Sequence, residues 1–157
     1  MIWVAVFGIM AILGSVFMLK PSRRDARLAT LRFEAARQGL QLKQYTWEPD
    51  SKKTGVYDKI MATSYTFLRP AATKQGELLF SIVGQKGWGG EGLPEGYSWH
   101  KEGSTKDAEL FSNLLPQLQD DLLVLEVWEN KAMLMAKENE TASAQAYQHF
   151  LESFLKK

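Results

Sequence analysis

The longest apolar run of the chain spans residues 2–19, IWVAVFGIMAILGSVFML, and contains no charged side chain. A helix of that length, rising ~1.5 Å per residue, nearly matches the ~30 Å hydrocarbon layer of a bilayer. A core helix would carry a polar face, and a cleaved signal peptide would have basic residues before the run and small ones after it. Here only Met1 precedes the run, and Lys20-Pro21-Ser22-Arg23-Arg24 follows it. The pattern predicts a retained transmembrane helix.

One stripe of this predicted helix is made of small residues, Gly8, Ala11 and Ser15. Small side chains let a second helix approach closely, and close packing drives helix association in lipid. Gly and Ala are also common in membrane spans that have no partner. The stripe therefore leaves two interpretations open, a helix–helix contact or ordinary composition.

A second helical pattern covers residues 23–38, and Ser22-x-x-Asp25 before it has the spacing of a capping box. Gly39 is placed to end the helix. The apolar positions are spaced as one amphipathic stripe: Leu28, Leu31 and Ala35, widened by Phe33 and Ala36. We expect the stripe to pack on the following domain, while Arg23, Arg24 and Arg27 lie near lipid headgroups.

Alternating and helical periodicities share the rest of the chain, and turn-rich segments, among them residues 48–56 and 70–76, separate them. The expected strands are residues 40–47, 57–69 and 77–85, followed by a hairpin of residues 122–128 and 131–137. The expected helices are residues 105–115 and 141–155. Clustered strands followed by helices predict an α+β domain with a small, mainly antiparallel sheet and two helices. The expected organisation is an anchor at 1–20, a basic juxtamembrane helix at 21–39 and a domain at 40–157.

Charge is distributed unevenly, and this changes the picture of the anchor. Residues 20–43 carry seven basic and two acidic side chains, whereas residues 44–157 carry twelve basic and sixteen acidic ones. Basic residues stay on the cytoplasmic side of a span and approach anionic headgroups. The N-terminus should therefore face outward, with the domain in the cytoplasm and the lipid bilayer as one partner. A mildly acidic domain argues against nucleic-acid binding.

Candidate chemistry is sparse. The chain has no cysteine, and its two histidines, His100 and His149, cannot make a usual structural zinc site unless a carboxylate such as Glu102 joins them. His149 is expected to face solvent, and Asp120-Asp121 to form a polar turn before a strand. No mutually supporting catalytic group is found, so we predict no enzyme activity, no metal and no cofactor.

The glycine-rich segment at 86–103 begins KGWGGEGLPEGYSWH and lacks the spacing of a phosphate-binding loop. As a surface loop, it offers Trp88, Leu93 and Tyr97 as partner-binding anchors, because exposed aromatic residues suit protein contacts. Trp99 has strand-like neighbours and is expected in the core. The alternative is a membrane-tethered enzyme or small-ligand binder that uses this loop around His100.

The layout resembles a poorly characterised group of Gram-negative inner-membrane proteins, some of which are labelled preprotein translocase subunit YajC. The resemblance is carried by the span exit Lys20-Pro21-Ser22-Arg23-Arg24, by Leu115-Pro116, by the hairpin residues 123–127 and by a terminal amphipathic helix. Similarity to YajC itself is confined to Phe17-Met18-Leu19-Lys20-Pro21, because the glycine-containing β motif expected soon afterwards is absent. The resemblance implies no catalytic residues.

Together these features predict a single-pass accessory or scaffold protein of the bacterial inner membrane. Its cytoplasmic domain would bind an unidentified membrane or cytoplasmic protein, in a translocase or envelope assembly. The enzyme or ligand binder around His100 stays open as an alternative, as does a lipid-surface sensor that uses the arginine residues after the span.

Overall fold

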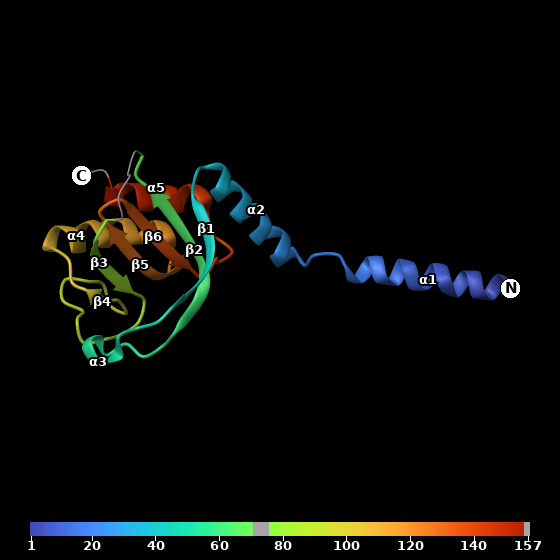
Figure 1. Ribbon diagram of the computed structural model, residues 1–157, viewed down its shortest axis with the longest axis horizontal. Coiled ribbons are helices and arrows are strands. Elements are labelled where there is room, and N and C mark those ends of the chain that lie inside the picture. Colours follow the sequence, from blue (N-terminus) through green and yellow to red (C-terminus); the bar gives the residue numbers. More distant parts are fainter. Residues whose placement is uncertain (71–75, 156–157) are drawn as a thin grey trace. The chain divides into compact units, whose positions relative to one another are not determined.

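The computed structural model of the chain describes residues 1–70 and 76–155 (Figure 1). It divides into two compact units, Met1–Thr30 and Leu31–Lys157. Across the described residues it is a mixed α+β structure with five α-helices and one six-stranded antiparallel sheet. The α+β prediction is confirmed. Of the turn expected at 70–76, residues 71–75 lie outside the described ranges.

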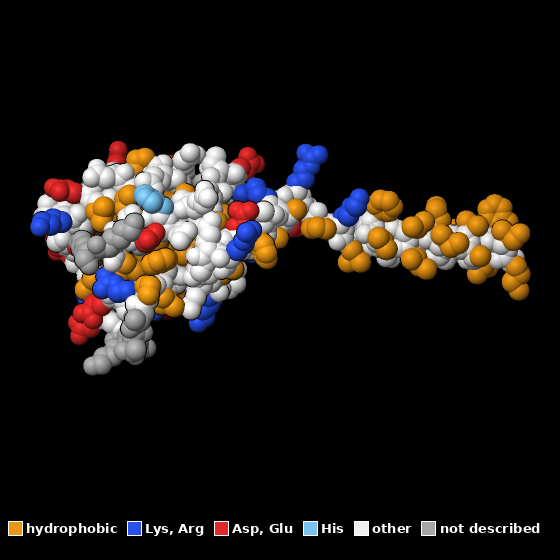
Figure 2. Space-filling view, turned by 90° about the horizontal axis from the view of Figure 1, so that it is seen from above, with side chains coloured by type: hydrophobic (Ala, Val, Ile, Leu, Met, Phe, Trp, Pro, Cys, Tyr) orange, Lys and Arg blue, Asp and Glu red, His pale blue; other side chains and the backbone are white. Residues whose placement is uncertain are grey.

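The first helix, α1, runs from Ile2 to Met18 and exposes every one of its residues. In Figure 2 its surface is covered by hydrophobic side chains, and Lys and Arg side chains follow where the helix ends. No single helix of the described chain has both the length and the hydropathy of a membrane span. Together Ile2–Met18 and Arg23–Arg37 meet those limits as a bent pair. The transmembrane assignment stays a prediction.

The second helix, α2, runs from Arg23 to Arg37. The Ser22 hydroxyl accepts a hydrogen bond from the backbone N–H of Asp25, 3.1 Å away, so the Ser22 half of the expected capping box forms. Gly39 follows two residues after the helix end, with a φ of +92° that suits glycine. Leu31 and Ala35 are buried, whereas Phe33 is 68% exposed. The predicted stripe is therefore narrower than expected, because Phe33 lies outside the packed face.

Six strands form the sheet in the order β1-β2-β6-β5-β3-β4, and every neighbouring pair is antiparallel. The strands are β1 Gln41–Trp47, β2 Ile60–Leu68, β3 Leu78–Val83, β4 Ser98–Lys101, β5 Leu122–Trp128 and β6 Lys131–Ala136. The β5–β6 hairpin is closed by Glu129-Asn130, as the sequence predicts. Leu134 lies between Tyr65 of β2 and Leu125 of β5 in the register.

One face of the sheet carries the main core. The second half of α2, α4 (Thr105–Leu114) and α5 (Ala144–Leu155) supply buried side chains to it. Phe111, Phe150 and Phe154 form a chain of edge-to-face aromatic contacts there. This apolar layer fixes the helices on the sheet, and Figure 1 shows α4 and α5 on the same side of it.

The opposite face is covered only in part. A smaller cluster of buried residues lies there: Trp47, Val56, Val83, Val124, Met133 and Met135. The segment between β1 and β2 includes a four-residue helix, α3 (Ser51–Thr54), which ends at Gly55 with φ +72°. This helix was expected only as a turn, and β4 was not expected within the glycine-rich segment. Both are four residues long, too short for a periodicity to be recognised.

Candidate functional site

A cleft forms where the glycine-rich segment, which includes β4, lies beside α3. We call it the tryptophan cleft, and it has a volume of about 390 Å³. It is lined by Lys53, Thr54, Trp88, Gly89, Glu91, Trp99, His100 and Glu102. It brings together Trp88, His100 and Glu102 from the residues that the sequence singled out.

Backbone contacts hold the glycine-rich segment against α3. The N–H of Trp88 donates to the carbonyl of Thr54 over 2.9 Å. At Gly87, a Cβ atom would lie 2.6 Å from that same carbonyl oxygen, so only glycine allows the approach. The ring of Trp88 lies over Gly55, and the side chain is nevertheless 70% exposed. The segment thus presents a large aromatic ring to solvent on a fixed backbone.

The second tryptophan of the cleft is structural. Trp99 is 8% exposed, as expected for a core residue, and its ring packs edge-to-face on Phe80. Its indole N–H donates to the carbonyl of Glu91 over 3.1 Å. This bond ties the glycine-rich segment to β4 and leaves Trp88 as the exposed indole of the cleft.

His100 has a structural hydrogen bond of its own. Its Nε2 accepts the backbone N–H of Asp50 over 3.0 Å, and its ring packs edge-to-face on Trp47. Partial burial lowers the pKa of the imidazole below its ordinary value, against the opposing charge of Asp50. The lone pair that a general base would use is therefore occupied by the protein backbone.

The other predicted anchors lie apart from Trp88. Leu93 and Tyr97 are half-buried and pack against the main core, with the Tyr97 and Phe111 rings 5.4 Å apart. On α1, Gly8 has no atom within 4 Å of the position a Cβ would take, and the Ser15 hydroxyl donates to the Ala11 carbonyl over 2.8 Å. Their predicted binding roles stay predictions.

The three arginine residues predicted to contact lipid headgroups lie at the start of α2. Arg23 and Arg24 are exposed and Arg27 is half-buried. His149 is exposed on α5, as expected, and its Nδ1 lies 2.9 Å from the Gln117 side-chain oxygen. Within the part of the chain that the structure describes, no group of three His, Asp or Glu side chains is arranged to hold a metal ion.

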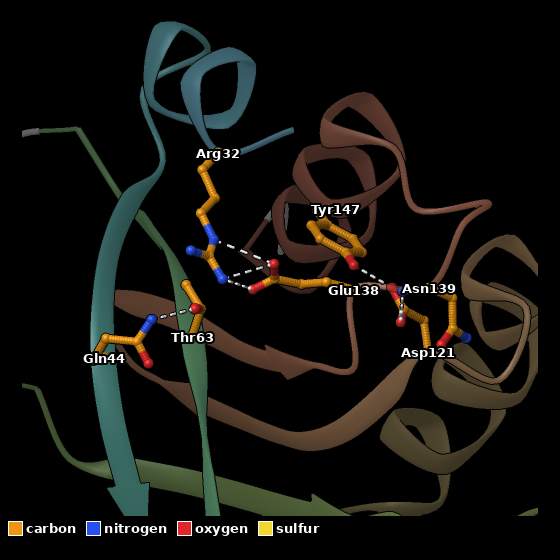
Figure 3. Close-up of polar contacts among 7 residues, drawn as sticks. All are labelled: Arg32, Gln44, Thr63, Asp121, Glu138, Asn139 and Tyr147. Carbon is orange, nitrogen blue, oxygen red and sulfur yellow. Dashed lines mark hydrogen bonds and ion pairs between the residues drawn. The ribbon is translucent and has the colours of Figure 1, made fainter. Parts of the chain in front are cut away.

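A second cluster of polar side chains was missed by sequence reasoning. This polar network consists of Arg32, Asp121, Glu138, Asn139 and Tyr147 (Figure 3). Asp121 is 1% exposed and Glu138 is 6% exposed, so both carboxylates are closed to solvent. The polar turn expected before β5 is present at Asp120, but the burial of Asp121 and its hydrogen bonds to Tyr147 and Asn139 were not predicted.

The Arg32 guanidinium donates hydrogen bonds from Nε and Nη2 to the Glu138 carboxylate, at distances of 3.0–3.2 Å. This forked arrangement is the strongest form of an ion pair between side chains. Glu138 itself has φ +58°, a left-handed backbone conformation that costs free energy for a residue with a Cβ. The pair joins α2 to the end of β6.

The Asp121 carboxylate accepts the hydroxyl of Tyr147 and the backbone N–H of Asn139, the latter over 2.9 Å. Burial raises the pKa of Tyr147, and the hydrogen bond to Asp121 raises it further. Burial likewise raises the pKa of Tyr65, whose ring packs on Tyr147. Both phenols therefore stay protonated, and the network holds β5, β6 and α5 together.

The two clusters differ in what they can do chemically. The polar network is closed and its charges are partnered, which is the arrangement of a structural centre. The tryptophan cleft is open and offers an exposed indole beside carboxylates, which is the arrangement of a binding surface. Comparison of the chain with protein-family models, with curated proteins and with solved structures finds no match.

Proposed function

We propose that the chain is a single-pass accessory protein of the bacterial inner membrane, with its N-terminus outside and its domain in the cytoplasm. The domain binds another protein through the tryptophan cleft. The proposal assigns no enzyme activity to the chain. Its main support is the exposed apolar surface of α1.

Seventeen consecutive residues of α1 are apolar or small, and all of them are exposed. Exposed apolar patches of this extent are rare on soluble monomers, because contact with water is unfavourable. A helix of seventeen residues lies at the short end of the range that crosses a bilayer. A lipid environment is therefore the cover that this helix fits.

The side chains after α1 favour one orientation. Arg23, Arg24 and Arg27 follow α1 within the first one and a half turns of α2. Basic residues close to a span stay in the cytoplasm and contact anionic headgroups. This supports a cytoplasmic domain.

The cleft supports protein binding over catalysis. Trp88 is 70% exposed on a backbone that is hydrogen-bonded to α3. Pre-positioned tryptophan rings are common anchors of protein interfaces. The catalytic alternative depends on His100, whose Nε2 is already bonded to Asp50. The resemblance at the span exit suggests a partner from a translocase or envelope assembly.

Topology provides the first test. A reporter that is active only in the cytoplasm, fused after Lys157, should be active. Replacing Arg23, Arg24 and Arg27 together by glutamate should weaken or invert the orientation, since the basic side chains would no longer hold the cytoplasmic side. Activity of a reporter that works only in the periplasm, fused to the unchanged chain, would contradict the proposal.

Crosslinking in membranes tests the binding role. A photoreactive amino acid replaces Trp88 in one variant and Met61 in the control, because Met61 is also exposed, at 78%, but lies on β2. We expect a discrete crosslinked protein with position 88 and none with position 61. His100→Ala should keep the crosslink made by position 88. Equal crosslinking at both positions, or loss with His100→Ala in a folded protein, would contradict the proposal.

A further inference from the structure

The tryptophan cleft continues into a neighbouring hollow of about 190 Å³ at the start of α4. Glu91, Trp99 and Glu102 line both hollows. A partner segment that occupies both hollows therefore lies beside these two carboxylates. Their charge, together with the indole of Trp88, decides what kind of group the cleft accepts.

Both carboxylates are available to a ligand. Glu91 and Glu102 are exposed, and within residues 1–70 and 76–155 neither side chain makes a hydrogen bond or an ion pair. Glu48 offers a contrast, because it lies 3.0 Å from the Lys59 ammonium. An unpaired carboxylate in a cleft attracts a cation more strongly than one already neutralised.

The positive charge on the wall of the cleft is partly compensated. Lys53 lies 3.7 Å from the carboxylate of Asp50. Lys101 on β4 does not line the cleft, and its ammonium group donates to the backbone carbonyl of Leu78. His100 is the remaining basic side chain of the cleft. Its Nε2 accepts a backbone N–H, so this nitrogen carries no proton and the ring is neutral. The cleft therefore presents net negative charge to a visitor.

The indole ring of Trp88 also favours binding of a cation. An indole face attracts cations, and guanidinium groups in particular stack on it. Trp88 keeps 70% of its surface exposed, so a planar cation can reach the ring. An anion would meet two carboxylates, and a purely apolar group would leave them desolvated without a partner.

We propose that the tryptophan cleft binds an arginine side chain from a basic segment of the partner protein. The guanidinium stacks on Trp88 and pairs with Glu91 and Glu102. This inference rests on the proposed protein-binding function and names the chemistry of the partner.

The test uses the full chain in zwitterionic detergent micelles, with its tryptophan indole N–H groups observed by NMR. The probe is the peptide acetyl-Gly-Arg-Gly-amide, and its control carries neutral citrulline in place of arginine. We expect the arginine peptide to shift the Trp88 indole resonance, which Trp88→Phe assigns by its disappearance. The citrulline peptide should leave that resonance unmoved. Added salt should weaken the arginine effect, because exposed ion pairs are screened.

Charge variants give the sharpest result. Glu91→Gln with Glu102→Gln should weaken peptide binding about fivefold or more, whereas Glu95→Gln, on the same segment but outside the cleft, should leave it unchanged. Lys53→Gln should tighten binding, because it removes the repelling charge from the cleft wall. Unchanged thermal melts confirm that each variant folds.

Two results would overturn the inference: equal shifts with the citrulline peptide, or undiminished binding by the double glutamine variant. A lysine peptide that binds more tightly than the arginine peptide would overturn the choice of arginine. The crosslinking experiment separates this failure from that of the proposed function. A partner captured at position 88 without arginine binding refutes only the chemistry, whereas arginine binding without any captured partner refutes the accessory role.

Discussion

The carboxylates of the polar network and those of the tryptophan cleft are the same chemical group in opposite environments. Asp121 and Glu138 are almost fully buried, and each is bonded to a named donor. Glu91 and Glu102 are exposed and make no such bond within the described residues. A buried charge without a partner costs several kcal/mol, whereas an exposed one costs almost nothing. The carboxylates of the network therefore stabilise the fold, whereas those of the cleft are accessible to a ligand.

The largest effect should come from breaking the ion pair of the network. Arg32→Ala leaves the 6%-exposed Glu138 without its cation, so the free energy of unfolding should fall by about 3 kcal/mol. Alanine keeps the helical propensity of α2, so the loss reports the pair itself. Urea unfolding followed by tryptophan fluorescence measures it.

Arg37→Ala is the matched control, because Arg37 lies exposed in the last turn of the same helix. Its effect should stay within about 0.5 kcal/mol. Equal losses in the two variants would show that the Arg32–Glu138 pair adds nothing beyond general charge.

A smaller loss is expected when the hydroxyl of Tyr147 is removed. Tyr147→Phe keeps the buried ring but leaves the Asp121 carboxylate with one donor fewer, which should cost about 2 kcal/mol of unfolding free energy. Tyr97→Phe is the control, since Tyr97 is half-buried and its hydroxyl has no bond within the described ranges. A destabilisation by Tyr147→Phe no larger than that of the control would refute a structural role for the bond.

The elements with long periodicities were predictable from sequence. The helix at 23–38 has a cap, an apolar stripe and a stopping glycine, and α2 follows these signals closely. The hairpin of residues 122–137 likewise combines two apolar runs with a two-residue turn. In each case the signal is local, because it repeats within one element.

The polar network could not be predicted in the same way. Arg32 and Glu138 are 106 positions apart, so no spacing relates them before the fold is known. Asp121 and Glu138 do carry a weak local signal. Asp121 directly precedes the apolar strand β5, and Glu138 comes two residues after the apolar strand β6. A carboxylate beside a buried strand is expected to need a buried partner. The glycine-rich segment was recognised, but its contact with α3 was not, since α3 has only four residues.

A glycine pair tests whether the cleft depends on a fixed Trp88. Gly55→Ala places a Cβ about 2.6 Å from the Trp88 Nε1 atom, so the ring must move. Gly96→Ala imposes a similar backbone cost, since φ is +72° at Gly55 and +90° at Gly96, but it meets no atom within 4 Å. We expect both to lose about 1 kcal/mol of unfolding free energy.

Only Gly55→Ala should shift the Trp88 indole resonance and weaken binding of the arginine peptide. NMR of the two variants under identical conditions decides this. If both variants bind the peptide as the unchanged chain does, the position of the indole ring is not what shapes the cleft.

The smallest effect concerns pH, and it joins the two regions, because His100 lines the cleft while supporting the fold. Burial lowers the pKa of His100 in the folded chain, whereas the unfolded chain keeps the ordinary value of about 6.5. The neutral ring accepts the Asp50 N–H, and a proton on Nε2 would abolish that bond. Below pH ~6.5 the unfolded state therefore takes up the proton first.

The contribution of His100 to stability should be complete near pH 7.5 and should shrink as the pH falls toward 5.5. Urea midpoints across this range should show a shallower decline for His100→Gln than for the unchanged chain, and His149→Gln, on the exposed face of α5, is the control. Identical curves for all three would mean that His100 contributes equally to the folded chain in both protonation states.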